Sequence, residues 1–393
     1  MKVTIVGAGA GGLVCSILLA KKGVNVVLVE KEKKTARKLR ATGNGKCNIT
    51  NTDINVYNYS SNTPEFIDKF ILPYKDIEKL FLSLGIPFKK NTDGRVFPLS
   101  MEANAVADKL EYIAKLYNVE IIKECEVLDV SKENDIWILR TTHEELKSEK
   151  LILAAGHKAG RCGGDDRIIQ AVEKWHTVYN AFPSLVQLTT KEDFTKCSGV
   201  KIKSKISLYS NGEFIRETYG DLLFTHYGIS GLAVLDISRD VAKRMNNYEY
   251  LEIKADFFSE TKDLKAVLKS INGDIHIGMI LRGVIPARLI PFVLKQAGIE
   301  GKKGLTPKDI NKLNYTLKNY KIEITGTKDF KNAEVVSGGV SIAEINPETM
   351  ESQKVKNLYF IGEMLDVDGD RGGYNLHFAW GCALKAARNI GSK

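Results

Sequence analysis

The sequence opens with a predicted strand, a glycine-rich turn, a helix and a second strand within thirty residues. The apolar run Val3 to Val6 leads into the sequence GAGAGG over residues 7–12. A helical pattern of apolar residues follows and stops near Gly23, and a valine-rich run then ends on Glu30. This order and spacing are typical of a βαβ unit that binds a dinucleotide. The chain is therefore predicted to contain a doubly wound, Rossmann-type α/β domain.

Each part of this unit has a physical role in binding a dinucleotide. Gly7 permits the tight turn, Gly9 lets the backbone approach a pyrophosphate, and Gly12 lets the helix pack closely on the sheet. The helix N-terminus, which begins near Ala10, presents free N–H groups and its positive dipole end to the phosphates. Glu30 stands eighteen residues after Gly12. At that spacing it is placed to accept hydrogen bonds from the adenosine ribose.

The far end of the chain favours FAD over NAD as the dinucleotide. A late strand-like run ends at Gly362 and Glu363, and Gly372 to Leu376 then open an apolar C-terminal helix. A second helix N-terminus at the cofactor suits a flavin, whose long molecule spans the domain. The alternative is a plain packing helix with a glycine-rich entry.

Composition and cysteine usage limit the classes of protein to which the chain can belong. The chain has 393 residues and six cysteines, with no CxxC pair and no clustering with histidine. This argues against a disulfide framework and a structural zinc site, and the expected compartment is the reducing cytoplasm. We expect no metal site. No leader peptide or apolar run long enough to span a membrane is recognised in the sequence.

The middle of the chain is predicted to be an insertion. Residues 1–187 and 327–393 are assigned to two parts of one FAD-binding domain. Residues 188–256 alternate like short strands, and residues 257–326 resemble short helices punctuated by proline and glycine. An insertion with a β-rich part and a helical part is therefore expected.

Charge is unevenly distributed over this insertion. The β-rich part holds ten basic and ten acidic residues, whereas the helical part holds twelve basic and six acidic residues. The helical part thus accounts for most of the net charge of +9. Such clustering is expected of a nucleic-acid-binding face. A solvated lysine surface in a lysine-rich chain is the alternative.

Seven further motifs carry a family resemblance. They are RKL at 37–39, TGNGKCNITN at 42–51, GRVFP at 94–98, LFTHYGISG at 223–231, SGGV at 337–340, GEMLD at 362–366 and GGYN at 372–375. Together with the opening unit and in this order, they resemble the BaiN/RdsA family of FAD-dependent oxidoreductases, also described as aminoacetone-oxidase-like flavoproteins. The resemblance covers nearly the full length. It implies an FAD domain of glutathione-reductase type that is split by an inserted domain.

The resemblance and the opening motif together imply a set of FAD-binding residues. The set is Gly7, Gly9, Ala10, Gly11, Gly12, Glu30, Lys31, Lys38, Thr42, Gly43, Gly45, Lys46, Asn48, Val127, Ala155, Gly156, Gly362, Glu363, Gly373, Tyr374, Asn375 and Leu376. Three departures from the family pattern bear on substrate preference. The usual GGGRCN block is GNGKCN here, His377 replaces the glutamine expected after GGYN, and the region from His157 to Asp166 is irregular.

Reduction of an activated C=C bond needs a proton donor as well as a hydride donor. Cys47 is the first candidate for a general acid, because its block is expected at the flavin ring; a buried apolar cysteine is the alternative. His226 is the second candidate, as an acid or as a substrate-binding residue. Tyr374 is a weaker catalytic candidate, and His377 a weaker substrate-binding one. Arg95 is a candidate for binding an anionic substrate, or it forms a surface ion pair.

The resemblance implies two substrate classes. One is a uridine in 23S rRNA, reduced to dihydrouridine by an NAD(P)H-driven flavin reductase. The charge of the helical insert favours this class, since the insert would bind rRNA or a ribosomal precursor, and rRNA uridine is the preferred substrate. The other is a small molecule, either an unsaturated steroid acid to be reduced or an amine such as aminoacetone to be oxidised. A non-catalytic, FAD-containing ribosome-binding protein is the third reading. Because no second strand–GxGxxG–helix unit is present, NAD(P)H is expected to act as a transient reductant.

Overall fold

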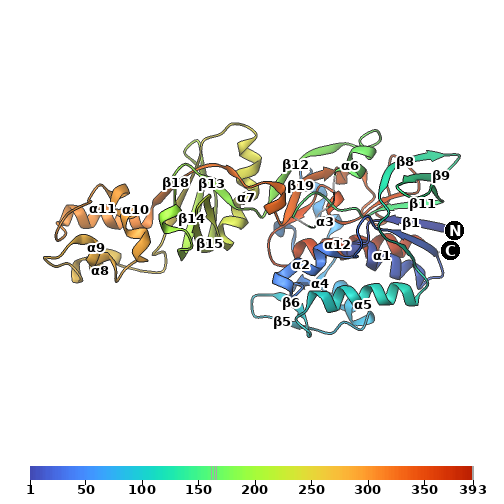
Figure 1. Ribbon diagram of the computed structural model, residues 1–393, viewed down its shortest axis with the longest axis horizontal. Helices are drawn as coiled ribbons and strands as arrows, with labels where there is room; N and C mark the ends of the chain where they lie inside the picture. Colours follow the sequence, from blue (N-terminus) through green and yellow to red (C-terminus); the bar gives the residue numbers. More distant parts are fainter. Residues whose placement is uncertain (161, 163, 165, 392–393) are drawn as a thin grey trace. The chain divides into compact units, whose positions relative to one another are not determined.

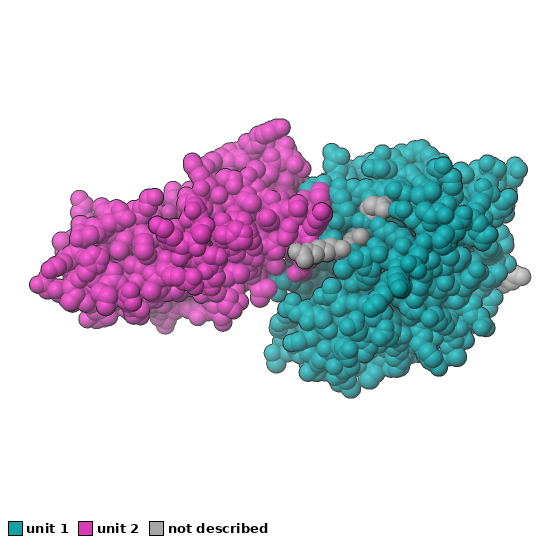
Figure 2. All heavy atoms as spheres, viewed as in Figure 1, with its two compact units in different colours: residues 1–182, 335–393 teal, residues 183–334 magenta. Residues whose placement is uncertain are grey.

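The chain folds into two compact units in this computed structural model, which describes residues 1–160, 162, 164 and 166–391. Unit 1 comprises residues 1–182 and 335–393, and unit 2 comprises residues 183–334 (Figure 2). The sequence placed these boundaries at 187/188 and 326/327. Unit 2 is longer because residues flanking the insertion pair with each other: the Lys328 amide donates to the Gln187 carbonyl at 2.8 Å, and the Glu334 amide to the Leu185 carbonyl at 3.2 Å.

Unit 1 is built on a five-stranded parallel sheet (Figure 1). Its order is β20 (Leu358–Phe360), β11 (Lys150–Leu153), β1 (Lys2–Val6), β2 (Asn25–Val29) and β7 (Glu120–Ile122). The four strands other than the edge strand β7 are largely buried, as is usual in parallel sheets whose faces are covered by helices. The predicted Rossmann-type α/β fold is confirmed.

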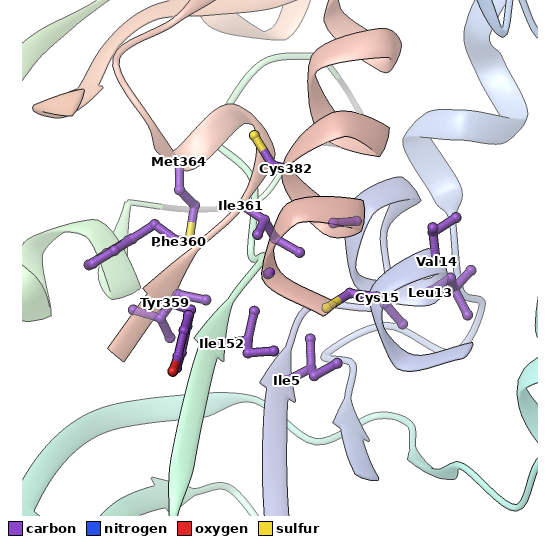
Figure 3. Close-up of a cluster of buried hydrophobic side chains, with 14 of the residues drawn as sticks. Ile5, Leu13, Val14, Cys15, Ile152, Tyr359, Phe360, Ile361, Met364 and Cys382 are labelled. Carbon is purple, nitrogen blue, oxygen red and sulfur yellow. The ribbon is translucent and has the colours of Figure 1, made fainter. Parts of the chain in front are cut away.

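Helices and small sheets cover this central sheet. Helix α1 (Ala10–Ala20) packs against α12 (Tyr374–Asn389), and α5 (Ala103–Leu116) packs against α1. Figure 3 shows side chains of β1, α1, β11, β20 and α12 meeting in one apolar core, among them Ile5, Leu13, Ile152, Phe360 and Cys382. The C-terminal helix thus shares a core with the first βαβ unit.

The rest of unit 1 consists of short elements. An antiparallel meander runs through β8 (Val127–Glu133), β9 (Ile136–Thr141) and β10 (Leu146–Ser148). Three more small sheets pair β3 (Thr50–Asn51) and β5 (Phe88–Lys90) with β6 (Arg95–Pro98), β4 (Tyr59–Ser60) with β21 (Asp368–Gly369), and β12 (Val178–Ser184) with β19 (Val335–Val340). The remaining α-helices are α2 (Arg37–Gly45), α3 (Ile67–Phe70), α4 (Tyr74–Ser83) and α6 (Arg167–Val172).

Unit 2 is a closed antiparallel barrel with added helices. The strand order is β13 (Leu188–Thr190), β16 (Gly228–Ser230), β15 (Glu213–Thr225), β14 (Lys201–Ser210), β17 (Leu251–Asp256) and β18 (Tyr320–Thr327), and β18 pairs with β13 to close it. Helix α7 (Leu232–Met245) packs on β15 and β14. Between β17 and β18 the chain forms α8 (Leu264–Ser270), α9 (Ile277–Leu281), α10 (Ile290–Ala297) and α11 (Pro307–Lys318).

The segment assigned to the helical part therefore includes a barrel strand. In β18, Tyr320, Ile322 and Ile324 are buried while Lys321 is exposed, which is the period-two pattern of a strand with one face in a core. Across the described residues, no helix combines the length and apolar character that a membrane crossing requires.

Candidate active site

The glycine turn after β1 is packed too tightly for side chains at two positions. Gly7 has φ +101°, and a Cβ there would lie 2.4 Å from the Ala154 carbonyl oxygen. A Cβ on Gly12 would lie 1.9 Å from the Gly7 carbonyl oxygen. These two glycines therefore fix the close approach of β1, β11 and α1.

Gly9 is different, because a Cβ there would meet no protein atom within 4 Å. It lies beside the start of α1, where the first amides have no carbonyl one turn earlier to accept their hydrogen bonds. Free amides at a helix N-terminus attract anions, and a glycine without a clash inside the protein leaves room for a ligand close to the backbone. The turn fits a pyrophosphate.

Glu30 lies at the end of β2 with its carboxylate directed toward this turn. Its Oε2 accepts from the Ala8 amide at 2.8 Å, and its Oε1 accepts from the Glu32 amide at 3.0 Å. Burial raises the pKa of Glu30. The segment that leads to Val127 runs alongside, since the Cys125 amide donates to the Glu30 carbonyl at 3.0 Å. Lys31 follows Glu30 in the chain and is half-buried.

A second group of predicted residues meets at the carboxyl end of the sheet. Lys38 Nζ lies 2.7 and 2.6 Å from the two carboxylate oxygens of Glu363, although the two residues are 325 positions apart. The Val336 amide donates to Glu363 Oε1 at 3.1 Å. A Cβ on Gly156 would lie 3.9 Å from Glu363 Oε2. Ala155 precedes it in the same loop after β11, beside Gly7.

The GGYN segment forms the start of α12. Gly373 has φ +103°, and a Cβ there would lie 2.7 Å from the Thr50 carbonyl. The Asn375 side chain accepts from the Gly369 amide and donates to its carbonyl, both at 2.8 Å. The amide of Leu376, like those of its neighbours, lies in the first turn, where helical partners are absent. Thr50 follows the TGNGKCN segment, so the two motifs are in direct contact.

The TGNGKCN segment breaks α2 near its end. Gly43 and Asn44 have φ of 59° and 53°, and the Cys47 amide donates to the Thr42 carbonyl at 3.0 Å. Gly45 and Lys46 are exposed, whereas Asn48 is buried and accepts from the Val96 amide at 3.3 Å. The loop therefore presents backbone and Lys46 to solvent and keeps its last residues in the protein.

The structure argues against Cys47 as the general acid. Its side chain is fully buried by the protein's own atoms. Neither cofactor nor substrate reaches the sulfur without displacing its neighbours. Burial also raises the pKa of the Cys47 thiol to about 12. The alternative of a buried apolar cysteine describes it better.

The substrate-binding role considered for His377 is also unsupported, because this side chain is fully buried. Its Nε2 donates to the Leu72 carbonyl at 2.8 Å, which leaves Nδ1 to accept from the Thr50 hydroxyl at 2.7 Å. Both ring nitrogens are therefore occupied within the protein. His377 ties the start of α12 to β3 and to the loop before α4.

Burial lowers the pKa of His377 to about 4, which predicts a pH-dependent stability. Below its ordinary pKa of 6.5 the unfolded chain takes up a proton that the folded chain excludes, so stability falls as pH drops toward 4. The loss attributable to His377 over this window is about 3 kcal/mol. His377→Gln keeps a donor and an acceptor but does not titrate, so the variant should lose less stability between about pH 7 and pH 4.

Denaturant unfolding followed by tryptophan fluorescence measures this effect, because all three tryptophans (Trp137, Trp175 and Trp380) lie in unit 1. The matched control is His143→Gln, which replaces an exposed histidine of the same unit. Burial raises the pKa of Asp366 to about 6 and gives a slope of opposite sign, but this slope is common to all variants and cancels in the comparison. Equal pH slopes for His377→Gln and the wild type would refute the assignment.

Three other candidates lie in different surroundings. Tyr374 retains 7% exposure, packs edge-on against Tyr59, and has a pKa that burial raises to about 12. Arg95 is paired with Asp93 at the start of β6, which agrees with the surface ion pair considered for it. His226 is exposed on the turn between β15 and β16 of unit 2, next to Tyr227.

Asp366, the last residue of the GEMLD motif, is a buried carboxylate that the sequence does not single out as a site residue. Asp366 accepts from the Ser61 hydroxyl at 2.9 Å and from the Asn62 amide at 2.7 Å. These bonds tie the loop after β4 to the segment that leads into GGYN. The sequence offers two signals for this contact, the Ser61-Asn62 pair shortly before a proline and an acidic residue within an apolar segment. Because these signals lie in distant parts of the chain, the sequence alone does not bring them together.

Comparisons with known proteins agree with this geometry. The HI0933-like protein Rossmann domain family matches residues 1–389. A 3-dehydro-bile acid delta(4,6)-reductase of Clostridium scindens is 32% identical over 403 residues, which cover 98% of both chains. Ribosomal RNA dihydrouridine synthases of Escherichia coli and Haemophilus influenzae are 31% and 30% identical, over 98% of this chain and 97% of theirs.

Solved structures share the fold at low sequence identity. A 3-ketosteroid-delta4-(5alpha)-dehydrogenase from Rhodococcus jostii has a TM-score of 0.52 at 10% identity, covering 100% of this chain and 96% of that one. A 3-ketosteroid delta1-dehydrogenase from Sterolibacterium denitrificans has a TM-score of 0.50 at 10% identity, with 99% of both chains covered. The glycine turn, the acid after β2 and the full-length family match together establish that the chain belongs to the HI0933-like Rossmann family of FAD-dependent oxidoreductases.

Proposed function

We propose that this protein is an NAD(P)H-driven flavin reductase that converts a uridine of 23S rRNA to dihydrouridine. The observation that carries the proposal is the excess of unpaired cations on the helical segment of unit 2. Dihydrouridine differs from uridine by two hydrogens across the C5–C6 bond. The reaction therefore needs a hydride donor, a proton donor and a surface that binds RNA.

Three of the twelve basic side chains between residues 257 and 326 form ion pairs. Lys302 pairs with Asp309, Lys318 with Asp256 and Lys321 with Glu252. The remaining nine have no carboxylate within 4 Å in this fully described stretch. They are Lys262, Lys265, Lys269, Arg282, Arg288, Lys295, Lys303, Lys308 and Lys312.

The acidic residues of the segment are largely occupied by structural contacts. Asp263 accepts from the Ala266 amide and caps α8. Asp309 caps α11 through Thr306, and Glu323 pairs with Lys191 of the barrel. Glu260, Asp274 and Glu300 are exposed in the same segment, but the nine unpaired basic side chains outnumber them, so a net positive charge faces solvent. A polyanion such as RNA releases counterions when it meets such a surface. Two of the relatives described above are named as ribosomal RNA dihydrouridine synthases.

We infer that FAD is held by the glycine turn, by Glu30 and by the two clusters around Glu363 and α12. When bound, the flavin supplies the hydride chemistry. The side chains of these clusters bind and orient the flavin, and one side chain at the site provides the proton. Cys47 and His377 are fully buried, whereas Tyr374 retains 7% exposure. Tyr374 is therefore the proton donor we propose in unit 1, and His226 of unit 2 is the competing candidate.

A phenylalanine at position 374 tests this assignment. Tyr374→Phe keeps the ring that packs on Tyr59 and removes the hydroxyl, so FAD content should be unchanged while turnover falls about 100-fold. Turnover is measured as dihydrouridine formed under anaerobic conditions. Tyr59→Phe is the matched control, because it also removes a buried hydroxyl from this cluster. Full turnover by Tyr374→Phe together with a loss in His226→Gln would transfer the role to His226.

A small-molecule substrate is the second candidate, favoured by the 32% identity to a bile acid reductase. The two candidates are separated by flavin reoxidation. The enzyme-bound flavin is first reduced with NAD(P)H without oxygen, and rRNA lacking dihydrouridine or an unsaturated steroid acid is then added. Reoxidation by the RNA supports the proposal. Reoxidation by the steroid acid alone supports the second candidate, and rapid hydrogen peroxide production with an amine would indicate an oxidase.

A further inference from the structure

Helix α11 carries a narrow exposed stripe. Lys308, Lys312 and Tyr315 are spaced by four and three residues, which places them on one face of the helix. All three side chains are exposed, and the Tyr315 ring is 59% exposed. The opposite face is apolar and buried through Ile310, Leu313 and Leu317. The helix begins with Pro307 and a complete capping box between Thr306 and Asp309. The stripe therefore lies on a helix whose N-terminus is stabilised by local hydrogen bonds.

The charges of this stripe are not neutralised by the protein. Asp309 is buried on the inner side, where it accepts from Thr306 and pairs with Lys302. Neither Lys308 nor Lys312 has an acidic partner within 4 Å in the described stretch 257–326. Lys303 is also exposed, on the strand-like turn that pairs with His276 just before the helix.

An exposed aromatic ring in line with unpaired lysines matches the chemistry of a single-stranded nucleic acid. Lysines bind phosphates without regard to sequence, and a base stacks on an aromatic face. A duplex offers phosphates but keeps its base faces stacked inside, so it cannot use the ring. An acidic peptide would use the lysines, but its carboxylates offer no aromatic face to stack on Tyr315.

We propose that the α11 stripe of Lys308, Lys312 and Tyr315 binds an unpaired RNA segment, with the lysines on phosphates and one base stacked on Tyr315. The inference rests on the proposed function for the identity of the polyanion as RNA. It adds the location of the contact and the requirement that the RNA be unpaired there. A uridine that is to be reduced has to leave its base stack, and a local unpaired segment is the substrate form in which it does so.

The test measures binding of the FAD-loaded full chain to a labelled oligouridine of about 12 nucleotides. Tyr315→Ala should weaken binding about tenfold without changing the salt dependence, and Tyr315→Phe should retain wild-type affinity. Lys308→Gln/Lys312→Gln should also weaken binding. In addition it should reduce the slope of log affinity against log salt by about 1.4, since each lost phosphate contact contributes about 0.7.

Matched controls are available in unit 1. Lys75→Gln/Lys79→Gln removes two exposed lysines with the same four-residue spacing on α4, and Tyr112→Ala removes a 66% exposed tyrosine on α5. Neither should change oligouridine binding. Against a duplex RNA of equal length, Tyr315→Ala should bind like the wild type. Polyglutamate should compete weakly with the oligouridine.

The inference is overturned if the wild type does not bind oligouridine at low salt, or if Tyr315→Ala binds it as well as the wild type does. It is equally overturned if the unit 1 controls lose as much affinity as the α11 variants, or if polyglutamate competes as well as RNA. Dihydrouridine formation by the same preparations separates the two claims. If dihydrouridine forms but RNA binding does not depend on Tyr315, the α11 stripe alone is refuted. If RNA binding depends on the stripe but no dihydrouridine forms, the proposed reaction alone is refuted.

Discussion

Replacing Gly9 by valine is expected to abolish FAD retention and to leave the FAD-free protein folded. A side chain at Gly9 would touch no protein atom within 4 Å, and its φ of −77° suits any residue. The added side chain would instead occupy space beside the free amides of α1, where the pyrophosphate is proposed to bind. Overlap with the phosphates should weaken FAD affinity by about a hundredfold or more.

Flavin absorbance of the purified variant and titration of the FAD-free protein with FAD measure this effect. Gly283→Val is the matched control, because Gly283 of unit 2 also has open space around its Cβ position. It should keep full FAD content. A Gly9→Val protein that purifies with stoichiometric FAD would contradict the assignment of this turn to the pyrophosphate. Loss of FAD together with loss of fold would contradict the claim that the position is open.

Gly12→Ala is expected to destabilise the fold of unit 1, because this position, unlike Gly9, has no room for a side chain. Its Cβ would lie 1.9 Å from the Gly7 carbonyl oxygen, which is backbone and cannot move aside independently of β1. Helix α1 would have to shift away from the sheet with which it shares the core of unit 1. We expect a loss of about 3 kcal/mol or more in the free energy of unfolding, with FAD binding lost as a consequence.

Gly11→Ala provides a sharp comparison for this prediction. Both glycines lie in α1 and gain similar helix propensity from alanine. A Cβ on Gly11 would lie 3.3 Å from the Ala379 carbonyl oxygen, so small adjustments accommodate it. Denaturant unfolding of the FAD-free proteins by tryptophan fluorescence reports on unit 1. Equal stability of the two variants would show that the close packing of α1 on β1 is not what Gly12 provides.

The first βαβ unit could be predicted from the sequence because its signals are local. The roles of Gly7 and Gly12 follow from short-range geometry, and apolar periodicity separates the strands from the helix. Barrel closure in unit 2 depends instead on β18, a strand that pairs with β13 far earlier in the chain. Its period-two pattern directly follows a helix, so it was assigned to the helical segment.

The side-chain environments of the site were harder to predict, for a related reason. The Lys38–Glu363 pair and the Asp366 contacts join residues more than three hundred positions apart. Residue type identified Cys47 and His377 as chemically capable side chains, but it carried no information on their burial. Burial is decided by tertiary packing, here by the contact between the TGNGKCN segment, the start of α12 and the loop before α4.

The central claim is that the protein reduces a uridine of 23S rRNA, and nucleoside mass spectrometry of large-subunit rRNA tests it most directly. The rRNA is compared between strains with and without the gene, and the deficient rRNA is then treated with purified protein, FAD and NAD(P)H. The account predicts that dihydrouridine disappears without the gene and is restored by the protein. Unchanged dihydrouridine in the deficient strain would contradict it and direct attention to small unsaturated or amine substrates.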